Sequence, residues 1–168
     1  MFQTILHLIS RTRRNHGLEH ATLNLLAKRK PGGRFAGHSD PAGFWIVGEI
    51  PTEELAEVTL EALSQLRGGK RELAYHQNCG TNYLVSGAAA GLAGAAGMIG
   101  TDRKNQSRWE RIPLVIALAT LALILTQPLG PLVQKKWTTS GRPGSLEIKL
   151  ITIQQWNGAT AHRVQTVN

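Results

Sequence analysis

The pattern of apolar and polar positions divides this chain into a mixed N-terminal part, a long apolar middle and a polar tail. In the first part, apolar residues recur at helical spacing over 1–14, over 15–30 and over 52–67. Asn15 and Thr52 are the first residues of the last two segments and are candidate N-caps, and glycines follow both segments. Residues 43–50 are aromatic and β-branched and predict a strand, whereas 34–42 predict a loop and 72–75 a short strand or a turn.

Two stretches in the middle of the chain carry no charge. Residues 83–100 are rich in glycine and alanine, and residues 112–133 are rich in leucine and isoleucine with prolines near their end. Each is long enough to cross a bilayer, so together they predict a transmembrane hairpin. Gly87, Gly91 and Gly94 form a small-residue surface of the kind that packs against other helices in lipid, which predicts contact with other membrane protein subunits.

The tail alternates apolar and polar residues on both sides of Asn157-Gly158, a dipeptide that favours a tight turn. It predicts a β-hairpin that joins the N-terminal strand in one sheet. The expected fold is therefore a small α+β domain over 1–82, a transmembrane hairpin over 83–133 with spans at 83–100 and 112–133, and a β-hairpin tail over 134–168.

Charge points to an anionic partner, because the 168-residue chain has a net charge of +8. Nucleic acid is not the expected partner, since no finger spacing, RNP-like motif or long basic helix is present. The basic residues lie beside apolar segments, which favours the lipid bilayer. Residues 1–14 predict a short amphipathic helix, and two alternatives are open: its arginines meet lipid headgroups, or the helix packs on its own domain. A single cysteine excludes an intrachain disulfide and agrees with a reducing compartment.

Candidate chemistry begins with His16-Gly17-Leu18-Glu19-His20, an H-x-x-E-H pattern. Residues four apart on a helix share a face, so both imidazoles can turn toward one point. This is the inverted form of the zincin motif, in which two histidines hold zinc and the glutamate acts as general base on its bound water. Gly17 either costs helix stability or lets another segment approach closely.

The expected remaining ligands are His76 and Cys79, which are three residues apart in a second cluster, His76-Gln77-Asn78-Cys79-Gly80-Thr81. Three protein ligands would leave a position for water and make a zinc site catalytic, with Glu19 as base. Four ligands would close the site and make the zinc, or another divalent transition metal, structural. The spacing does not decide between these alternatives, nor against His76 and Cys79 being structural residues without a metal.

The two motifs, H-G-x-E-H-x-T over 16–22 and H-x-x-C-G-T over 76–81, resemble the YqhQ-type bacterial membrane family of predicted metal-dependent enzymes. The whole chain, including Gly37-His38-Ser39-Asp40 and Gly43-Phe44-Trp45, also resembles an uncharacterised bacterial family of unknown function. These resemblances imply a multi-pass protein of the bacterial inner membrane that binds metal. The distribution of lysine and arginine slightly favours cytoplasmic tails.

Two functions follow as hypotheses. The first is a membrane-anchored metal-binding protein that acts as a zinc-dependent hydrolase. The second is a non-enzymatic small subunit or assembly factor of a membrane complex, in which the motifs only stabilise the domain.

Overall fold

The computed structural model describes residues 2–99, 108–156 and 158–167. These residues form two compact units: Met1–His76 with Lys135–Asn168, and Gln77–Gln134. The first unit, hereafter the sheet unit, is mixed α and β, as the sequence predicts. The second, hereafter the helical unit, contains the apolar middle of the chain.

A four-stranded antiparallel sheet is the centre of the sheet unit, in the order β1-β2-β4-β3. Its strands are β1 (Ala36–Asp40), β2 (Gly43–Val47), β3 (Glu147–Trp156) and β4 (Ala159–Val167). The predicted C-terminal hairpin is confirmed, and it joins the N-terminal strand because β4 pairs with β2. Asn157, from the predicted turn, lies outside the described residues. The loop prediction for 34–42 is wrong, since β1 gains its strand character from pairing with β2 rather than from local propensity.

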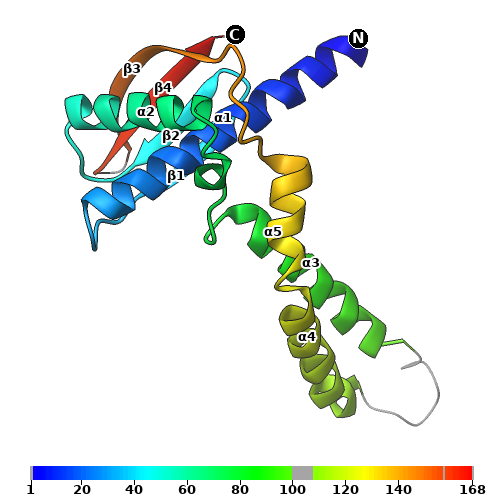
Figure 1. Cartoon of the computed structure of the whole chain (residues 1–168). Helices are drawn as coiled ribbons and strands as arrows, with labels where there is room; N and C mark the ends of the chain where they lie inside the picture. The colour runs from blue at the N-terminus through cyan, green and yellow to red at the C-terminus, as the bar shows by residue number, and fades with distance from the viewer. Residues whose placement is uncertain (1, 100–107, 157, 168) are drawn as a thin grey trace. The chain divides into compact units, whose positions relative to one another are not determined.

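Two helices, α1 (Phe2–Arg29) and α2 (Thr52–Arg67), lie side by side on one face of this sheet (Figure 1). Alternate strand residues meet them: Phe44 and Ile46 of β2 stand beside Val164 and His162 of β4. These side chains and the apolar stripes of both helices form the core. Its fully buried apolar residues include Leu18, Leu26, Leu55, Val58, Phe44, Ile46 and Val164.

Two local predictions in this unit need correction, and a third is decided between its alternatives. One continuous α1 replaces the two predicted helices, so Asn15 lies inside a helix and caps nothing. Pro51, not Thr52, precedes the first turn of α2, and the Thr52 hydroxyl instead contacts Nε2 of His162 at 3.1 Å. Of the two alternatives predicted for 72–75, a short strand or a turn, the structure has the turn, a 3₁₀ helix named η1 (Arg71–Ala74).

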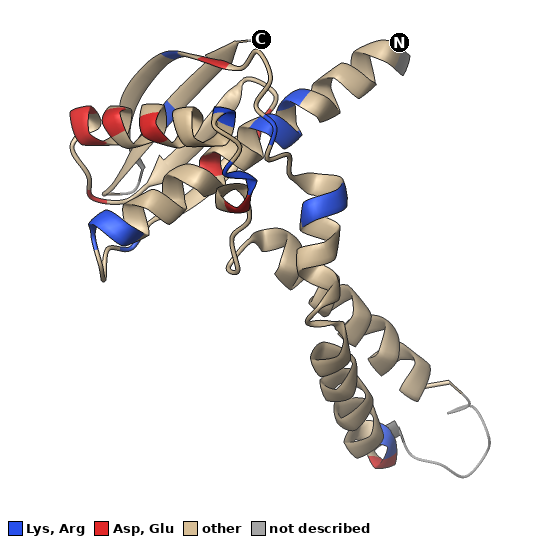
Figure 2. Ribbon diagram, in the orientation of Figure 1, with Lys and Arg blue, Asp and Glu red and all other residues tan. Residues whose placement is uncertain are grey.

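The helical unit contains α3 (Gly80–Gly97), η2 (Arg108–Arg111), α4 (Ile112–Thr126) and α5 (Leu129–Val133); η3 (Gln134–Thr138) leads back to the sheet unit. Figure 2 shows α3 and α4 without charged residues. They pack on each other where the Gly97 backbone meets Val115 and Leu118. α4 ends at Thr126, shortly before Pro128, because a proline cannot donate the next hydrogen bond of the helix.

One candidate membrane span, Trp109–Thr126, is found among the described residues. The two-span hairpin is therefore not supported, and neither is a multi-pass protein. The reason lies in α3, whose sequence is mostly glycine and alanine and so offers little apolar surface to lipid. The second span is also shorter than the predicted 112–133, because α4 ends at Thr126. Residues 101–107, between the two predicted spans, lie outside the described residues.

Candidate metal centre

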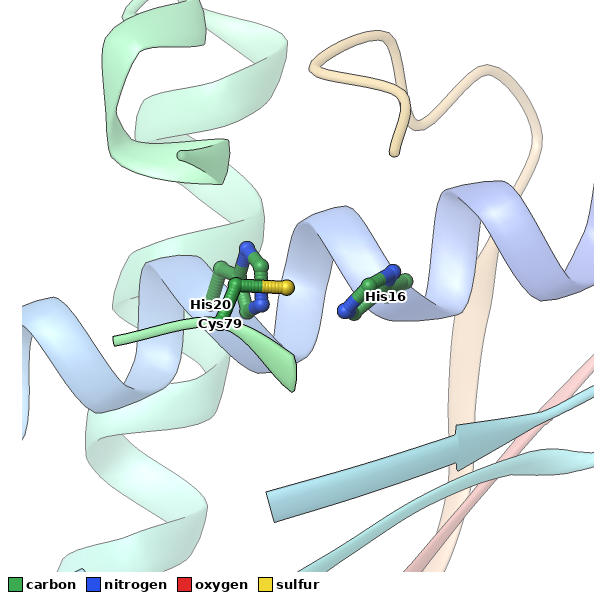
Figure 3. A group of neighbouring side chains, drawn as sticks. All are labelled: His16, His20 and Cys79. Carbon is green, nitrogen blue, oxygen red and sulfur yellow. The ribbon is translucent and has the colours of Figure 1, made fainter. Parts of the chain in front are cut away.

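His16 and His20 stand one turn apart on the same face of α1, as the H-x-x-E-H spacing predicts (Figure 3). Their ring centroids are 4.2 Å apart with the planes inclined at 62°. A ring nitrogen of His16 lies within 4.8 Å of a ring nitrogen of His20. Two imidazoles at this separation can bind one metal ion after small side-chain rotations, since zinc binds histidine nitrogens at about 2.0–2.1 Å.

Backbone carbonyls fix the orientation of both rings. Nδ1 of His16 lies 3.0 Å from the Thr138 carbonyl oxygen, and Nδ1 of His20 lies 2.9 Å from that of Ala74. A carbonyl oxygen only accepts, so in each neutral ring Nδ1 carries the proton and donates. Each Nε2 then holds a lone pair. This arrangement is the usual one for metal-binding histidines, whose second nitrogen donates to a carbonyl or carboxylate.

Gly17 allows the chain segment that supplies the first of these carbonyls to approach α1. A Cβ at this position would lie 2.9 Å from the carbonyl carbon of Ser140 and closer still to its oxygen. The Ser140 amide also donates to the Arg13 carbonyl at 2.8 Å, and Nη2 of Arg13 donates to the Lys136 carbonyl at 2.8 Å. Of the two readings of Gly17, close approach is the one that the structure shows.

His76, at the end of the sheet unit, brings a third imidazole to this face of α1. Its ring centroid is 5.9 Å from that of His20. Cys79 directly precedes α3 and belongs to the helical unit, so its assignment as a ligand stays a prediction.

Glu19 faces the sheet. Its side chain is buried and accepts a hydrogen bond from the Ser39 hydroxyl of β1. A Cβ on Gly37 would lie under 3.0 Å from the Glu19 carboxylate, so the glycine makes room for it. Residues 37 and 39 share a strand face, and His38 between them is exposed on the other face. Sequence reasoning missed Gly37 and Ser39, although their alternation in Gly37-His38-Ser39-Asp40 is compatible with a strand.

A second polar contact joins α1 to the sheet one turn earlier. The Asn15 amide donates to the Asp40 carbonyl at 2.8 Å, and its oxygen accepts from the Thr166 hydroxyl at 2.7 Å. These two hydrogen bonds of Asn15 fix the rotation of α1, and with it the direction of the histidines.

Burial alone would raise the pKa of the Asp40 carboxyl. Hydrogen bonds from Arg163 and from backbone amides, with the charge of Arg163, together outweigh burial and hold that pKa below its usual value.

Comparison with known proteins gives a family without an assigned activity. Residues 11–151 match the model of Domain of unknown function (DUF6391), and the chain belongs to that family. An uncharacterised protein of Picosynechococcus sp. is 37% identical over 94 residues, which cover 50% of this chain and 46% of the relative. The chain thus spans about half the length of this curated relative. No solved structure matches the chain.

Proposed function

We propose that this chain is a membrane-associated metal-binding protein in which His16 and His20 bind a divalent transition metal, zinc first, through Nε2. The observation that carries the proposal is the pair of Nδ1–carbonyl hydrogen bonds. They direct two unprotonated nitrogens from one helix face, and histidines that serve only to fill a core need no such shared direction.

His76 and Cys79 complete the proposed ligand set. His76 needs only a side-chain rotation, because its ring already lies beside that of His20. Cys79 follows it by three residues, so the chain keeps the two Cα atoms within roughly 10 Å of each other. A thiolate and three imidazoles form a set that suits zinc.

Membrane association is proposed from α4. None of its residues is buried, and leucine and isoleucine side chains are exposed around it, including Ile116, Leu121, Ile124 and Leu125. A core helix of a water-soluble protein buries at least one face, whereas a helix surrounded by lipid need not.

Metal content tests the proposal. Detergent-purified protein, never exposed to chelator, is measured by elemental mass spectrometry beside His16→Ala and His20→Ala. The matched control is His38→Ala, which removes an exposed histidine from the opposite face of β1. We expect near-stoichiometric metal in the wild type and control, and its loss in both helix variants. Equal metal content in His20→Ala and the wild type would overturn the assignment.

Hydrolysis is the catalytic alternative to this closed site, in which only three of the four residues bind zinc and water takes the fourth position. Zinc lowers the pKa of bound water to about 7, and a carboxylate can then accept its proton. Glu19, three residues after His16 on the same helix, is the proposed base, and its carboxylate would have to leave Ser39 and turn toward the histidines to act. Glu19→Gln should retain metal and lose activity toward a panel of ester and peptide substrates. Activity unchanged by this variant would assign Glu19 a structural role.

The alternative proposal, a subunit or assembly factor, is favoured by one observation on α3. A Cβ at Gly87 or Gly91 would meet nothing within 4 Å, so this part of the small-residue surface is open, whereas Gly94 and Gly97 face Val115 of α4. Replacing Gly87 and Gly91 with isoleucine should release a partner helix. The test is to purify the wild type and the variant separately from the native membrane and to compare the membrane proteins that co-purify with each.

A further inference from the structure

The first turns of α1, residues 2–10, extend beyond the sheet as an amphipathic helix without charge (Figure 1). At 100° per residue its apolar side chains cover an arc of roughly 160°. Four of them are about half exposed: Ile5 at 49%, Leu6 at 45%, Leu8 at 42% and Ile9 at 50%. The opposite arc carries only uncharged polar residues and a histidine: Gln3, Thr4, His7 and Ser10. This apolar face is not packed on its own domain.

The same face of α1 continues to the histidines. Ile5, Ile9, His16 and His20 follow one another at spacings of four, seven and four, which keep side chains in one row along a helix. The apolar arc thus points away from Leu18, which is fully buried in the core, and toward the side of the candidate metal centre.

The chain leaves the sheet unit and returns to it beside this face. It leaves at His76, whose ring lies 5.9 Å from that of His20. It returns at Lys135, and the next carbonyl, of Lys136, accepts from Arg13 of α1. Between these points runs the segment with the candidate membrane span. At the return point Lys135 and Lys136 are exposed, and Trp137 is 74% exposed.

We propose that this face of α1 lies in the plane of an anionic bilayer surface. The apolar arc of residues 2–10 enters the boundary between headgroups and acyl chains, and Lys135, Lys136 and Trp137 lie at headgroup level. Lysine and tryptophan are the side chains that favour this zone, and basic residues beside an apolar helix attract anionic lipid. A protein partner is disfavoured because the polar arc offers no charge to specify one. The inference rests on the membrane association proposed above and not on the metal.

Amide hydrogen exchange on the full chain tests this contact. The protein is reconstituted as one copy per nanodisc, in phosphatidylcholine alone and in phosphatidylcholine with phosphatidylglycerol. On the anionic discs the amides of residues 6–10 should exchange roughly tenfold more slowly than on the neutral discs, because lipid contact suppresses fraying of this exposed helix end.

Two variants with the same added charge on the two arcs provide the comparison. Ile5→Glu with Ile9→Glu places two carboxylates on the apolar arc and should abolish the protection. Gln3→Glu with His7→Glu places two on the polar arc and should retain most of it. Equal exchange on both lipids, or equal loss in both variants, would overturn the proposal while leaving the span intact. Failure of the wild type to enter discs would overturn the span as well.

Discussion

Gly17 offers the sharpest test of how the candidate centre is held together. In Gly17→Ala the new methyl group would overlap the Ser140 carbonyl, and the segment 138–140 must move away from α1. Two hydrogen bonds end with that movement: Ser140 amide to Arg13 carbonyl at 2.8 Å, and His16 Nδ1 to Thr138 carbonyl at 3.0 Å.

The expected loss of stability follows from these contacts. Each hydrogen bond contributes about 1 kcal/mol, and the overlap adds about 1–3 kcal/mol. Alanine recovers about 1 kcal/mol of helix propensity. The free energy of unfolding should therefore fall by about 2–4 kcal/mol. Metal affinity should fall by roughly 10–100-fold as well, because the His16 ring loses the acceptor that orients it.

Urea unfolding in a fixed detergent, followed by tryptophan fluorescence, gives the first quantity, and metal titration gives the second. Gly87→Ala is the matched control, because a Cβ there meets nothing within 4 Å and the helix propensity change is the same. It should leave stability unchanged or raise it. If Gly17→Ala unfolds at the same urea concentration as the wild type, the close approach is not what positions His16.

Three further predictions concern the contacts between the helices and the sheet. Ser39→Ala removes a donor from the buried Glu19 carboxylate and should cost about 1–3 kcal/mol in urea unfolding. Burial lowers the pKa of His162, despite the opposing charge of Glu49. The unfolded chain therefore takes up a proton near pH 6.5 while the folded chain does not, so stability should fall as pH drops below about 6.5, and His162→Gln should remove this slope. The pKa of Asp40 is lowered, so its ion pair with Arg163 stabilises the fold above about pH 4 and is lost below. Because solvent screens this partly exposed pair, Asp40→Asn should cost about 0.5–1 kcal/mol at neutral pH and flatten the acid limb of the unfolding curve.

Periodicity was sufficient for the elements whose local signal agrees with their environment. The C-terminal hairpin and α2 have apolar residues at the spacing of their own secondary structure, and glycines mark the end of α2. β1 has no such signal, because Gly37 and Ser39 are in a strand through pairing with β2 and contact with Glu19. The predicted break between two helices at Asn15 was wrong for the opposite reason. Asn15 has the side chain of an N-cap, but that side chain hydrogen-bonds Asp40 and Thr166 of the sheet.

For the candidate centre, the sequence supplies the ligand types and not their orientation. The i, i+4 spacing placed His16 and His20 on one face, and His76 was predicted as a further ligand from its residue type and its spacing of three residues from Cys79. The acceptors of the two Nδ1 protons are the main-chain carbonyls of Thr138 and Ala74. Every residue has such a carbonyl, so the amino-acid sequence cannot identify these two as the acceptors. Residues 83–100 were predicted to span a membrane because they are long and uncharged. Most of them are glycine and alanine, however, so α3 is less apolar than its lack of charge suggested.

The strand order β1-β2-β4-β3 has a consequence for synthesis on the ribosome. The last strand of the chain, β4, lies inside the sheet between β2 and β3, and it covers the core beneath α1 and α2. The N-terminal elements therefore cannot complete their hydrophobic core until residues 159–167 have been translated, after the whole apolar middle of the chain has emerged. Contacts this distant in sequence form slowly and leave apolar surface open in the meantime. Nascent chains that stall before residue 159 should be recognised by chaperones or degraded, whereas the helical unit can form before the sheet is complete.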